Sequence, residues 1–382
     1  MSRKIISYVL GALLLIVLLS AQILQPVSQD EQSGSVHPTP VQAEGEESVD
    51  DSHSGEQEGF DPAEFVFDHI LDAYEWHILT YKDFHLSIPL PVIIYSKNKG
   101  LAVFMFSKFH HGHSDHQGFR YETSGENRGK IVEILEDGST ALPALDLSFT
   151  KNVLAIMISL IFMLWLFLSI AKAYREREGR APTGVQNLFE PIILFIRDDI
   201  ARPSIGESKY MRFLPYLLTI FFFIWFNNML GLVPIFPGGA NITGNITVTG
   251  VLALFTFFIT TINGNRNYWT HIFNTPGVPW WVKIPIPLMP AIELIGMFTK
   301  PFVLMVRLFA NMSAGHIITL GFISLIFIFG QIQVALGYGV SILSLAFTIF
   351  MFMLEFLVAL IQAYVFTLLS ALYFGMATEE HH

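Results

Sequence analysis

The chain has 382 residues, of which 52% are hydrophobic and only 14% are charged. A soluble domain of this size carries about a quarter charged residues, so much of this surface must face something other than water. The absence of cysteine excludes disulfides, thiolate metal sites and cysteine nucleophiles. The net charge is −10, with acids concentrated in residues 30–72, and no basic face indicates binding to nucleic acid.

The first 59 residues have the pattern of an exported segment. Basic residues precede the apolar run Ile5–Leu19 and small residues follow it, so residues 1–21 are predicted to be a secretory signal peptide. Leu19 suits the cleavage site poorly, which leaves an uncleaved membrane anchor as the alternative. Residues 22–59 are acidic and poor in apolar side chains, so we expect a disordered linker.

A small folded region is predicted over residues 60–146, on the extracytoplasmic side of a membrane. Phe60–His77 has apolar residues at helical spacing. Short segments separated by Pro and Gly favour strands, and they are Phe84–Tyr95, Ala102–Phe109 and Lys130–Leu135. This combination predicts an α+β domain. The histidines between His110 and His116 either bind a metal ion or form an exposed loop, and the sequence leaves both open.

Three membrane spans are predicted next, at Phe149–Ala171, Phe213–Val233 and Val248–Ile262, because these segments are apolar and free of charge. Lys172 and three arginines follow the first span, and positive charge marks the cytoplasmic side. Between the first two spans, Val185–Ile200 is expected to be an amphipathic helix in the cytoplasmic interface.

The last third of the chain predicts two unusually long helices. The first, Leu288–Gly330, would extend about 65 Å, roughly twice the thickness of the hydrocarbon layer. It must therefore tilt, bend or lie partly flat, and Pro301 is a candidate for the bend. After a connection at Gln331–Gly339, the second helix is expected at Val340–Phe374. The predicted fold is an all-α polytopic membrane protein with five transmembrane helices, two of them a long tilted hairpin, with the C-terminus in the cytoplasm.

Seven polar residues interrupt the apolar sequence of the two long helices. The first helix carries Glu293, Lys300, Arg307, Asn311 and His316, and the second carries Glu355 and Gln362. At about 100° per residue, the first four lie within about 80° of arc, and His316 lies about 180° from Arg307. In an antiparallel pair, Gln362 can reach the level of Arg307 while Glu355 lies near that of His316.

Structural roles compete with functional roles at most of these positions. Glu293 and Lys300 lie near the start of the helix, where long side chains can reach water. Asn311 and Gln362 could bond one helix to another, and the acid and imidazole could simply satisfy each other. Arg307 differs because its guanidinium cannot lose its proton, so it needs a permanent polar or anionic partner.

The stretch Pro301–His316, PFVLMVRLFANMSAGH, resembles the arginine helix of subunit a of the F-type ATP synthase. The agreement extends to FLPYLLTIFFFIWFNNMLGLVP, which follows the amphipathic helix, and to the ending MATEEHH. It also includes Glu293-Leu294, Glu355 and Gln362-Ala363. The resemblance covers about Ser148–His382 and assigns residues 147–382 to a subunit a membrane domain. The preceding region does not match the common bacterial form.

The resemblance implies roles for the polar positions. Arg307 matches the stator arginine that faces the rotor ring of c subunits, and Asn311 and Gln362 match the polar residues beside it. Glu293 and Lys300 match supporting polar positions on the same helix.

His316 and Glu355 match a proton relay whose acid and imidazole many bacterial members carry in the opposite order. The implied mechanism has two half-channels separated by Arg307, each delivering to a carboxylate of the rotating c-ring. No nucleotide-binding loop is present, so ATP chemistry would belong to other subunits, and no cofactor is predicted. The implied partners are the c-ring, b subunits, the rest of the ATP synthase and membrane lipid, in a bacterial inner membrane.

Two other classes of function compete with this interpretation. A secondary transporter would place a substrate site at broken helices, but no internal repeat is found in the sequence. A scaffold for an envelope complex would depend on the extracytoplasmic domain. Solute uptake by the chain alone would favour the transporter.

Overall fold

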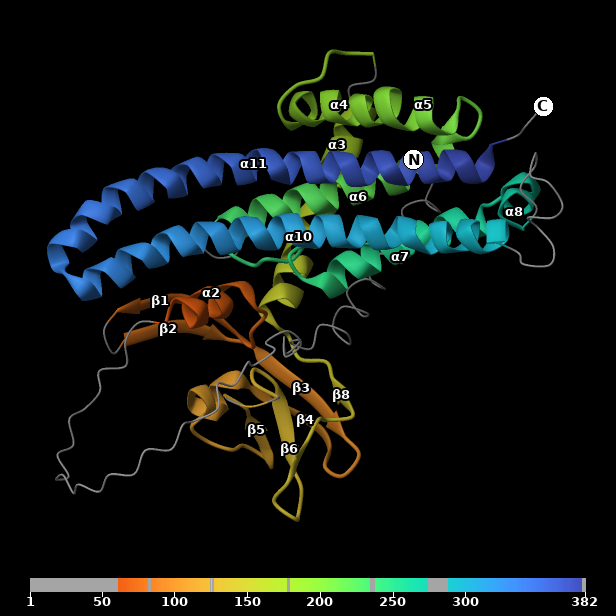
Figure 1. Cartoon of the computed structure of the whole chain (residues 1–382). Coiled ribbons are helices and arrows are strands. Elements are labelled where there is room, and N and C mark those ends of the chain that lie inside the picture. Colours follow the sequence, from red (N-terminus) through yellow and green to blue (C-terminus); the bar gives the residue numbers. More distant parts are fainter. Residues whose placement is uncertain are drawn as a thin grey trace, which may run out of the picture.

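The computed structural model describes residues 61–81, 84–123, 125, 127–176, 179–233, 238–273 and 288–379. The predicted signal peptide and disordered linker lie outside these residues. The described part has two layers, a domain of short strands and, above it in Figure 1, a layer of helices.

Within the described residues, the strand domain combines one short helix with three antiparallel sheets of order β1-β2, β4-β3-β8 and β5-β6-β7. Its elements are α2 (Pro62–Ile70), β1 (Glu75–Tyr81), β2 (Phe84–Pro89), β3 (Pro91–Ser96), β4 (Gly100–Met105), β5 (Phe119–Tyr121), β6 (Ile131–Ile134), β7 (Thr140–Ala141) and β8 (Leu145–Asp146). Alternate residues of β3 point inward, and Val92 and Ile94 pack with Phe109 and Phe119 in a small apolar core.

The α+β prediction for this region is confirmed, but two boundaries are wrong. The helix predicted for Phe60–His77 ends at Ile70, because Glu75–Tyr81 pairs with β2. Tertiary pairing therefore overrides the helical spacing there. The strand predicted for Ala102–Phe109 continues from β4 into a 3-10 helix, Phe106–Gly112.

The helical layer contains the predicted spans. Its elements are α3 (Lys151–Glu176), α4 (Val185–Phe195), α5 (Arg202–Ile205), α6 (Tyr210–Leu232), α7 (Ile246–Ile262), α8 (Arg266–Phe273), α10 (Leu288–Ile332) and α11 (Val334–Thr378). Among the described residues, α3, α6, α10 and α11 are each long and apolar enough to cross a membrane. The pair α7 and α8, bent by 103°, would make a fifth span. The predicted polytopic helical fold is confirmed, and the five predicted spans correspond to these four helices together with the bent pair.

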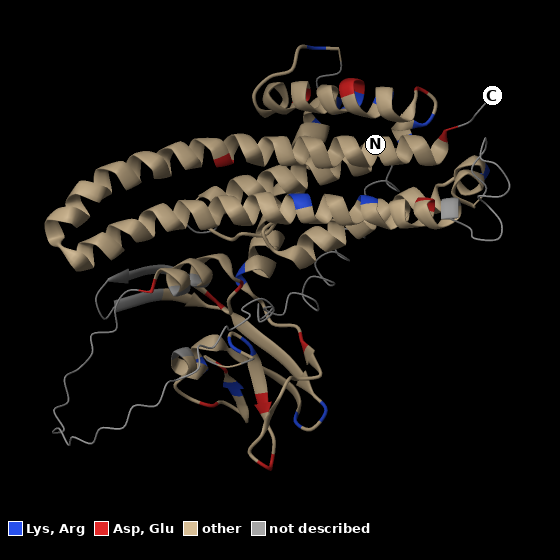
Figure 2. Cartoon of the chain, in the orientation of Figure 1, with Lys and Arg blue, Asp and Glu red and all other residues tan. Residues whose placement is uncertain are grey.

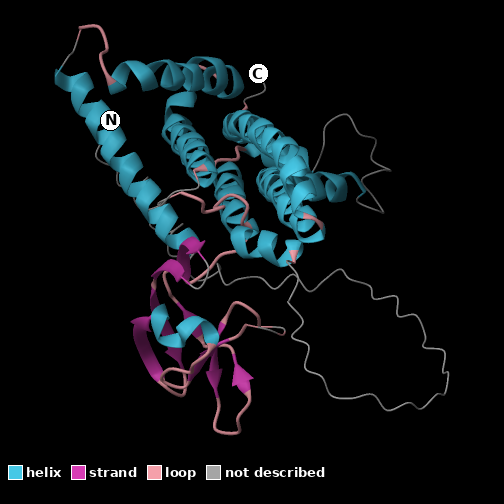
Figure 3. Ribbon diagram, turned by 90° about the vertical axis from the view of Figure 1, so that its left-hand side faces the viewer, coloured by secondary structure: helices cyan, strands magenta, loops and turns pink. Residues whose placement is uncertain are grey.

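The long hairpin dominates this layer. Helices α10 and α11 have 45 residues each and lie side by side (Figures 1 and 3). The predicted connection at Gln331–Gly339 is too long, because only Gln333 separates the two helices. Gly337 makes this possible, since a Cβ atom there would lie 2.8 Å from the Gly330 Cα. Helix α10 continues through Pro301.

Charged side chains gather outside the hairpin, in the strand domain and in the α4–α5 region (Figure 2). The α4–α5 segment packs on α11 at the side opposite the strand domain (Figure 1). The predicted amphipathic helix is therefore present, with π-helical turns at Ile196–Ala201 joining α4 to α5. The apolar core lies between α3, α6, α7 and the second half of α11.

Candidate functional site

The polar residues of the hairpin are placed by its antiparallel register. Three contacts fix this register: the Phe322 and Phe347 rings are 5.1 Å apart, His316 Nδ1 lies 3.9 Å from Glu355 Oε1, and Lys300 Nζ lies 5.6 Å from the Tyr373 ring. The predicted proximity of His316 and Glu355 is therefore confirmed. The same register puts Gln362, which is buried, at the level of Arg307.

The Glu355 carboxyl group is buried in the interface between the two long helices. It is 6% exposed and accepts a hydrogen bond of 3.1 Å from Thr319 Oγ1. Gly315 makes room for it, because a Cβ atom at that position would lie 2.6 Å from Glu355 Oε1. The gap of 3.9 Å to His316 is longer than a hydrogen bond but short enough for a proton to pass through one water.

Helix α6 and the loop after it supply a second polar wall that the sequence interpretation did not single out. Thr243 Oγ1 donates to Asn228 Oδ1, and Asn228 Nδ2 donates to the Ala359 carbonyl of α11. Gly231 approaches His316 Nε2 closely, and Ser313 Oγ donates to the Gly244 carbonyl at 3.1 Å. The sequence feature that could have predicted this wall is the pair of asparagines in FNN, inside an apolar span. Burying two amides in a membrane span costs free energy unless polar groups or water face them.

Several polar atoms near this wall are buried without a hydrogen-bond partner in the described part of the chain. They are His316 Nδ1, Asn227 Oδ1, Asn241 Nδ2 and Thr348 Oγ1. Buried polar groups are nearly always paired with protein or with ordered water. This side of the hairpin is therefore chemically suited to hold water.

Arg307 lies away from this cluster, on an outward face of α10. The residue is half-buried, its neighbour Asn311 is exposed, and the surrounding side chains are exposed apolar residues such as Val303 and Val306. Among the described residues, its guanidinium makes no hydrogen bond or ion pair, although its charge acts on Tyr373. A permanent cation on an apolar surface requires an anionic or polar partner, which here must come from outside the described residues.

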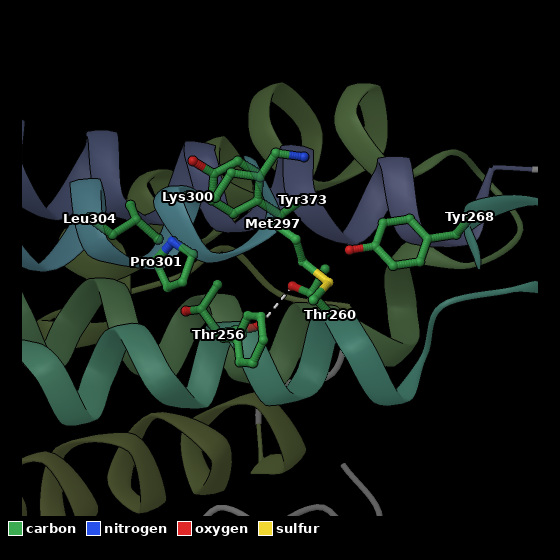
Figure 4. A pocket seen from close by; sticks show the side chains of 9 residues that line it. Thr256, Thr260, Tyr268, Met297, Lys300, Pro301, Leu304 and Tyr373 are labelled. Atoms are coloured by element: carbon green, nitrogen blue, oxygen red, sulfur yellow. Dashed lines mark hydrogen bonds between the residues drawn. The ribbon is translucent and has the colours of Figure 1, made fainter. Parts of the chain in front are cut away.

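Glu293 and Lys300 belong to a different polar group, nearer the start of α10. Glu293 Oε1 lies 4.0 Å from His271 Nδ1 of α8, and Lys300 lies over the Tyr373 ring. Lys300 also lines a small pocket with Thr256, Thr260, Tyr268, Met297 and Tyr373 (Figure 4). Arg307 thus lies along α10 between this polar pocket and the His316–Glu355 cluster.

The histidine-rich segment adopts the 3-10 helix and the turn that follows it. His116 packs edge-on against Phe104 with ring centroids 4.9 Å apart. Within the described residues, no three His, Cys, Asp or Glu side chains are arranged to hold a metal ion.

The fold and the site define a class: a polytopic membrane protein whose long helical hairpin carries an arginine between two polar clusters, with no ion pair to any residue that the structure describes. Residues 153–375 match the family model described as ATP synthase A chain, and the chain belongs to this family, the proton-conducting stator subunit of the Fo sector. Residues 65–150 match a second model, described as a domain of unknown function, DUF8433.

Curated relatives support the same assignment. The chain is 42% identical over 245 residues to ATP synthase subunit a of Chloroherpeton thalassium, covering 62% of this chain and 69% of the relative. It is 46% identical over 253 residues to ATP synthase subunit a 2 of Chlorobium luteolum, covering 63% and 70%. It is 43% identical over 261 residues to ATP synthase subunit a of Myxococcus xanthus, covering 66% and 79%.

Proposed function

We propose that Arg307 is the residue that couples proton flow to rotation, by separating two half-channels that serve a carboxylate on a rotor ring of c subunits. The observation that supports this is its position: a fixed cation on an outward face of α10, between two polar clusters and without an ion pair in the described part of the chain. Asn311 is exposed on α10 about one turn further along, and Gln362 lies at the same level on α11. Asn311 would orient the rotor carboxylate near Arg307, and the buried Gln362 would orient Arg307 itself.

The proposed orientation follows the positive charge after α3. Lys172 and Arg175 lie at its end, and this charge supports a cytoplasmic position for α4 and an outer position for the strand domain. In this orientation the cluster of His316, Glu355 and Asn228 forms the outer half-channel. The pocket beside Lys300, with Glu293 at its edge, forms the cytoplasmic one.

In this mechanism a proton enters from outside, passes His316 and Glu355, and neutralises the rotor carboxylate. The neutral acid can then rotate through lipid, where a bare carboxylate would carry a large desolvation penalty. When the acid returns to Arg307, the guanidinium favours its ionised form and drives proton release into the other half-channel. The same charge repels cations that would cross directly. The b subunits and the rest of the synthase complete the proposed set of partners.

The test is Arg307→Ala in the whole complex. ATP-driven proton pumping into inverted vesicles is expected to fall to background, because no fixed cation discharges the rotor carboxylate. The assembled complex should still purify with its normal composition, since Arg307 makes no hydrogen bond or ion pair with a described residue of this chain. Arg212→Ala, at an exposed position near the start of α6, is the matched control and should pump normally. Retained pumping in Arg307→Ala would refute the proposal.

A further inference from the structure

The strand domain covers the helical layer on the side that leads to His316 and Glu355. Helix α2 packs along the second half of α10, where the Phe65 and Phe327 rings are 6.1 Å apart. Trp76 of β1 is 3% exposed and belongs to the apolar core of the membrane helices. A proton approaching the cluster from this side must therefore pass the junction between the two layers.

That junction buries an unusual set of polar groups at the start of α3. Asp72 Oδ1 accepts hydrogen bonds of 3.0 Å from the backbone N–H groups of Asn152 and Ala73. Lys151 is 8% exposed, and its Nζ donates to the His69 carbonyl at 3.3 Å. In the described part of the chain, Asp72 Oδ2 and Asn152 Oδ1 are buried without a hydrogen-bond partner, which indicates positions for water.

The junction is also electrostatically connected to the relay pair. The Lys151 ammonium is close enough to act on Asp72 on one side and on His316 on the other. His316 in turn lies 3.9 Å from Glu355. Asp72 and His316 therefore both lie within the electrostatic reach of Lys151, and Glu355 lies beside His316.

We propose that Asp72 is an additional proton-handling residue, which collects protons at the outer mouth and passes them through water to His316 and Glu355, with Lys151 as its fixed counter-charge. The carboxylate binds a proton from bulk water as an O–H group and releases it to a water on the hairpin side. The carboxylate is thereby restored, and no other bond changes. This inference rests on the proposed function, because it takes the strand domain to be outside and His316–Glu355 to be the relay.

The environment of Asp72 gives the step a pH signature. Burial raises the pKa of Asp72 from 3.8 to about 6, while the hydrogen bonds from Asn152 and Ala73 and the nearby Thr150 and Lys151 act in the opposite direction. The other ionisable groups beside it are His69 of α2 and the buried pair in which Tyr74 Oη donates to Asp146 Oδ2. The Asp72 carboxyl becomes protonated as the outer pH falls through about 6, so proton delivery should rise over that interval and then level off.

The experiment measures passive proton conduction through the Fo sector, freed of its soluble part and reconstituted in liposomes, as a function of outer pH. Asp72→Asn keeps an acceptor for both N–H groups but cannot bind a proton. Its proton conduction is expected to be about fivefold lower, because water at the open outer mouth can take over only part of the proton transfer. The inflection of its pH profile near pH 6 should be lost. Asp137→Asn, in an exposed turn where it bonds to Ser139, is the control and should match the unmodified complex.

A second variant separates proton handling from a purely structural role. Asp72 accepts a hydrogen bond from the Asn152 N–H at the start of α3, and Asn can accept such a bond as well as Asp does. If Asp72 had only this structural role, the pH profile of Asp72→Asn would be unchanged. Lys151→Gln removes the cation that lowers the Asp72 pKa, so the inflection should move to higher pH, and Lys151→Arg should leave it in place. An Asp72→Asn profile that superimposes on the unmodified one overturns the inference. If Asp72→Asn does not assemble, an unmoved inflection in Lys151→Gln overturns it.

Glu355→Gln distinguishes this inference from the function on which it rests. Normal conduction in Glu355→Gln would show that His316 and Glu355 are not the proton relay, which refutes the proposed function. Abolished conduction in Glu355→Gln, together with an unchanged pH profile in Asp72→Asn, would support the relay and refute only the proposed role of Asp72.

Discussion

The strand domain and the α10–α11 hairpin use polar side chains differently. In the strand domain, buried carboxyl groups accept short hydrogen bonds from other side chains: Tyr74 bonds to Asp146 and Ser96 bonds to Glu133, both at 2.6 Å, although Glu133 Oε1 and Asp72 Oδ2 have no partner among the described residues. In the hairpin, polar side chains are few, and the Arg307 guanidinium and the buried His316 Nδ1 atom make no hydrogen bond with the described residues. The contrast teaches that an unsatisfied polar group marks function most clearly where the surroundings are apolar, because its free-energy cost is largest there.

The largest effect on proton conduction is expected when the space around Glu355 is overfilled. In Gly315→Val, the new side chain would start 2.6 Å from Glu355 Oε1 and displace the carboxyl group from the helix interface. Proton conduction is expected to fall by at least about tenfold, the scale on which a proton-transfer group contributes. The measurement is passive conduction through the reconstituted Fo sector.

Gly321→Val provides the matched control, because it lies on the same helix and nothing is within 4 Å of a Cβ atom built there. It should conduct normally. Equal losses in both variants would mean that a β-branched residue in α10 is harmful by itself, and the contact with Glu355 would not explain the effect.

A smaller effect is expected where the two regions meet. Trp76→Ala removes a side chain that is 3% exposed and packs into the helical core, which should weaken the docking of the strand domain by about 3–5 kcal/mol. Limited proteolysis of the assembled complex should then cut the strand domain faster, while the membrane helices remain protected. Tyr95→Ala, at a position 48% exposed, should leave the cleavage rate unchanged. Unchanged cleavage in Trp76→Ala would show that the domain is held by other contacts.

The sequence predicted the hairpin better than the strand domain, for a physical reason. Long charge-free runs have one stable solution in a membrane, so α3, α6 and both long helices fall close to their expected positions. Helix spacing was compatible with Glu355 lying beside His316 in an antiparallel pair, and the structure brings the two side chains to 3.9 Å. The short strands of the N-terminal domain depend on non-local pairing, which is why β1 was mistaken for the end of a helix.

Two parts of the candidate site could not be predicted from periodicity. The polar wall formed by Asn228 and Thr243 depends on how the loop after α6 folds back into the bundle. The junction of Asp72 with Lys151 joins residues that the prediction placed in separate domains. Both are products of tertiary packing, and neither residue pair has a spacing that indicates contact.

The most direct test of the central claim asks whether the face of α10 beside Arg307 meets the rotor. The chain has no cysteine, so Asn311→Cys places its single thiol on this exposed face. Paired with a c subunit that carries one cysteine next to its carboxylate, it is expected to form a disulfide on mild oxidation and to stop ATP-driven rotation until reduced. Met312→Cys, at the next residue but 3% exposed within the bundle, should not cross-link. Cross-linking from Met312→Cys and none from Asn311→Cys would contradict the account, because the Arg307 face would then point away from the rotor.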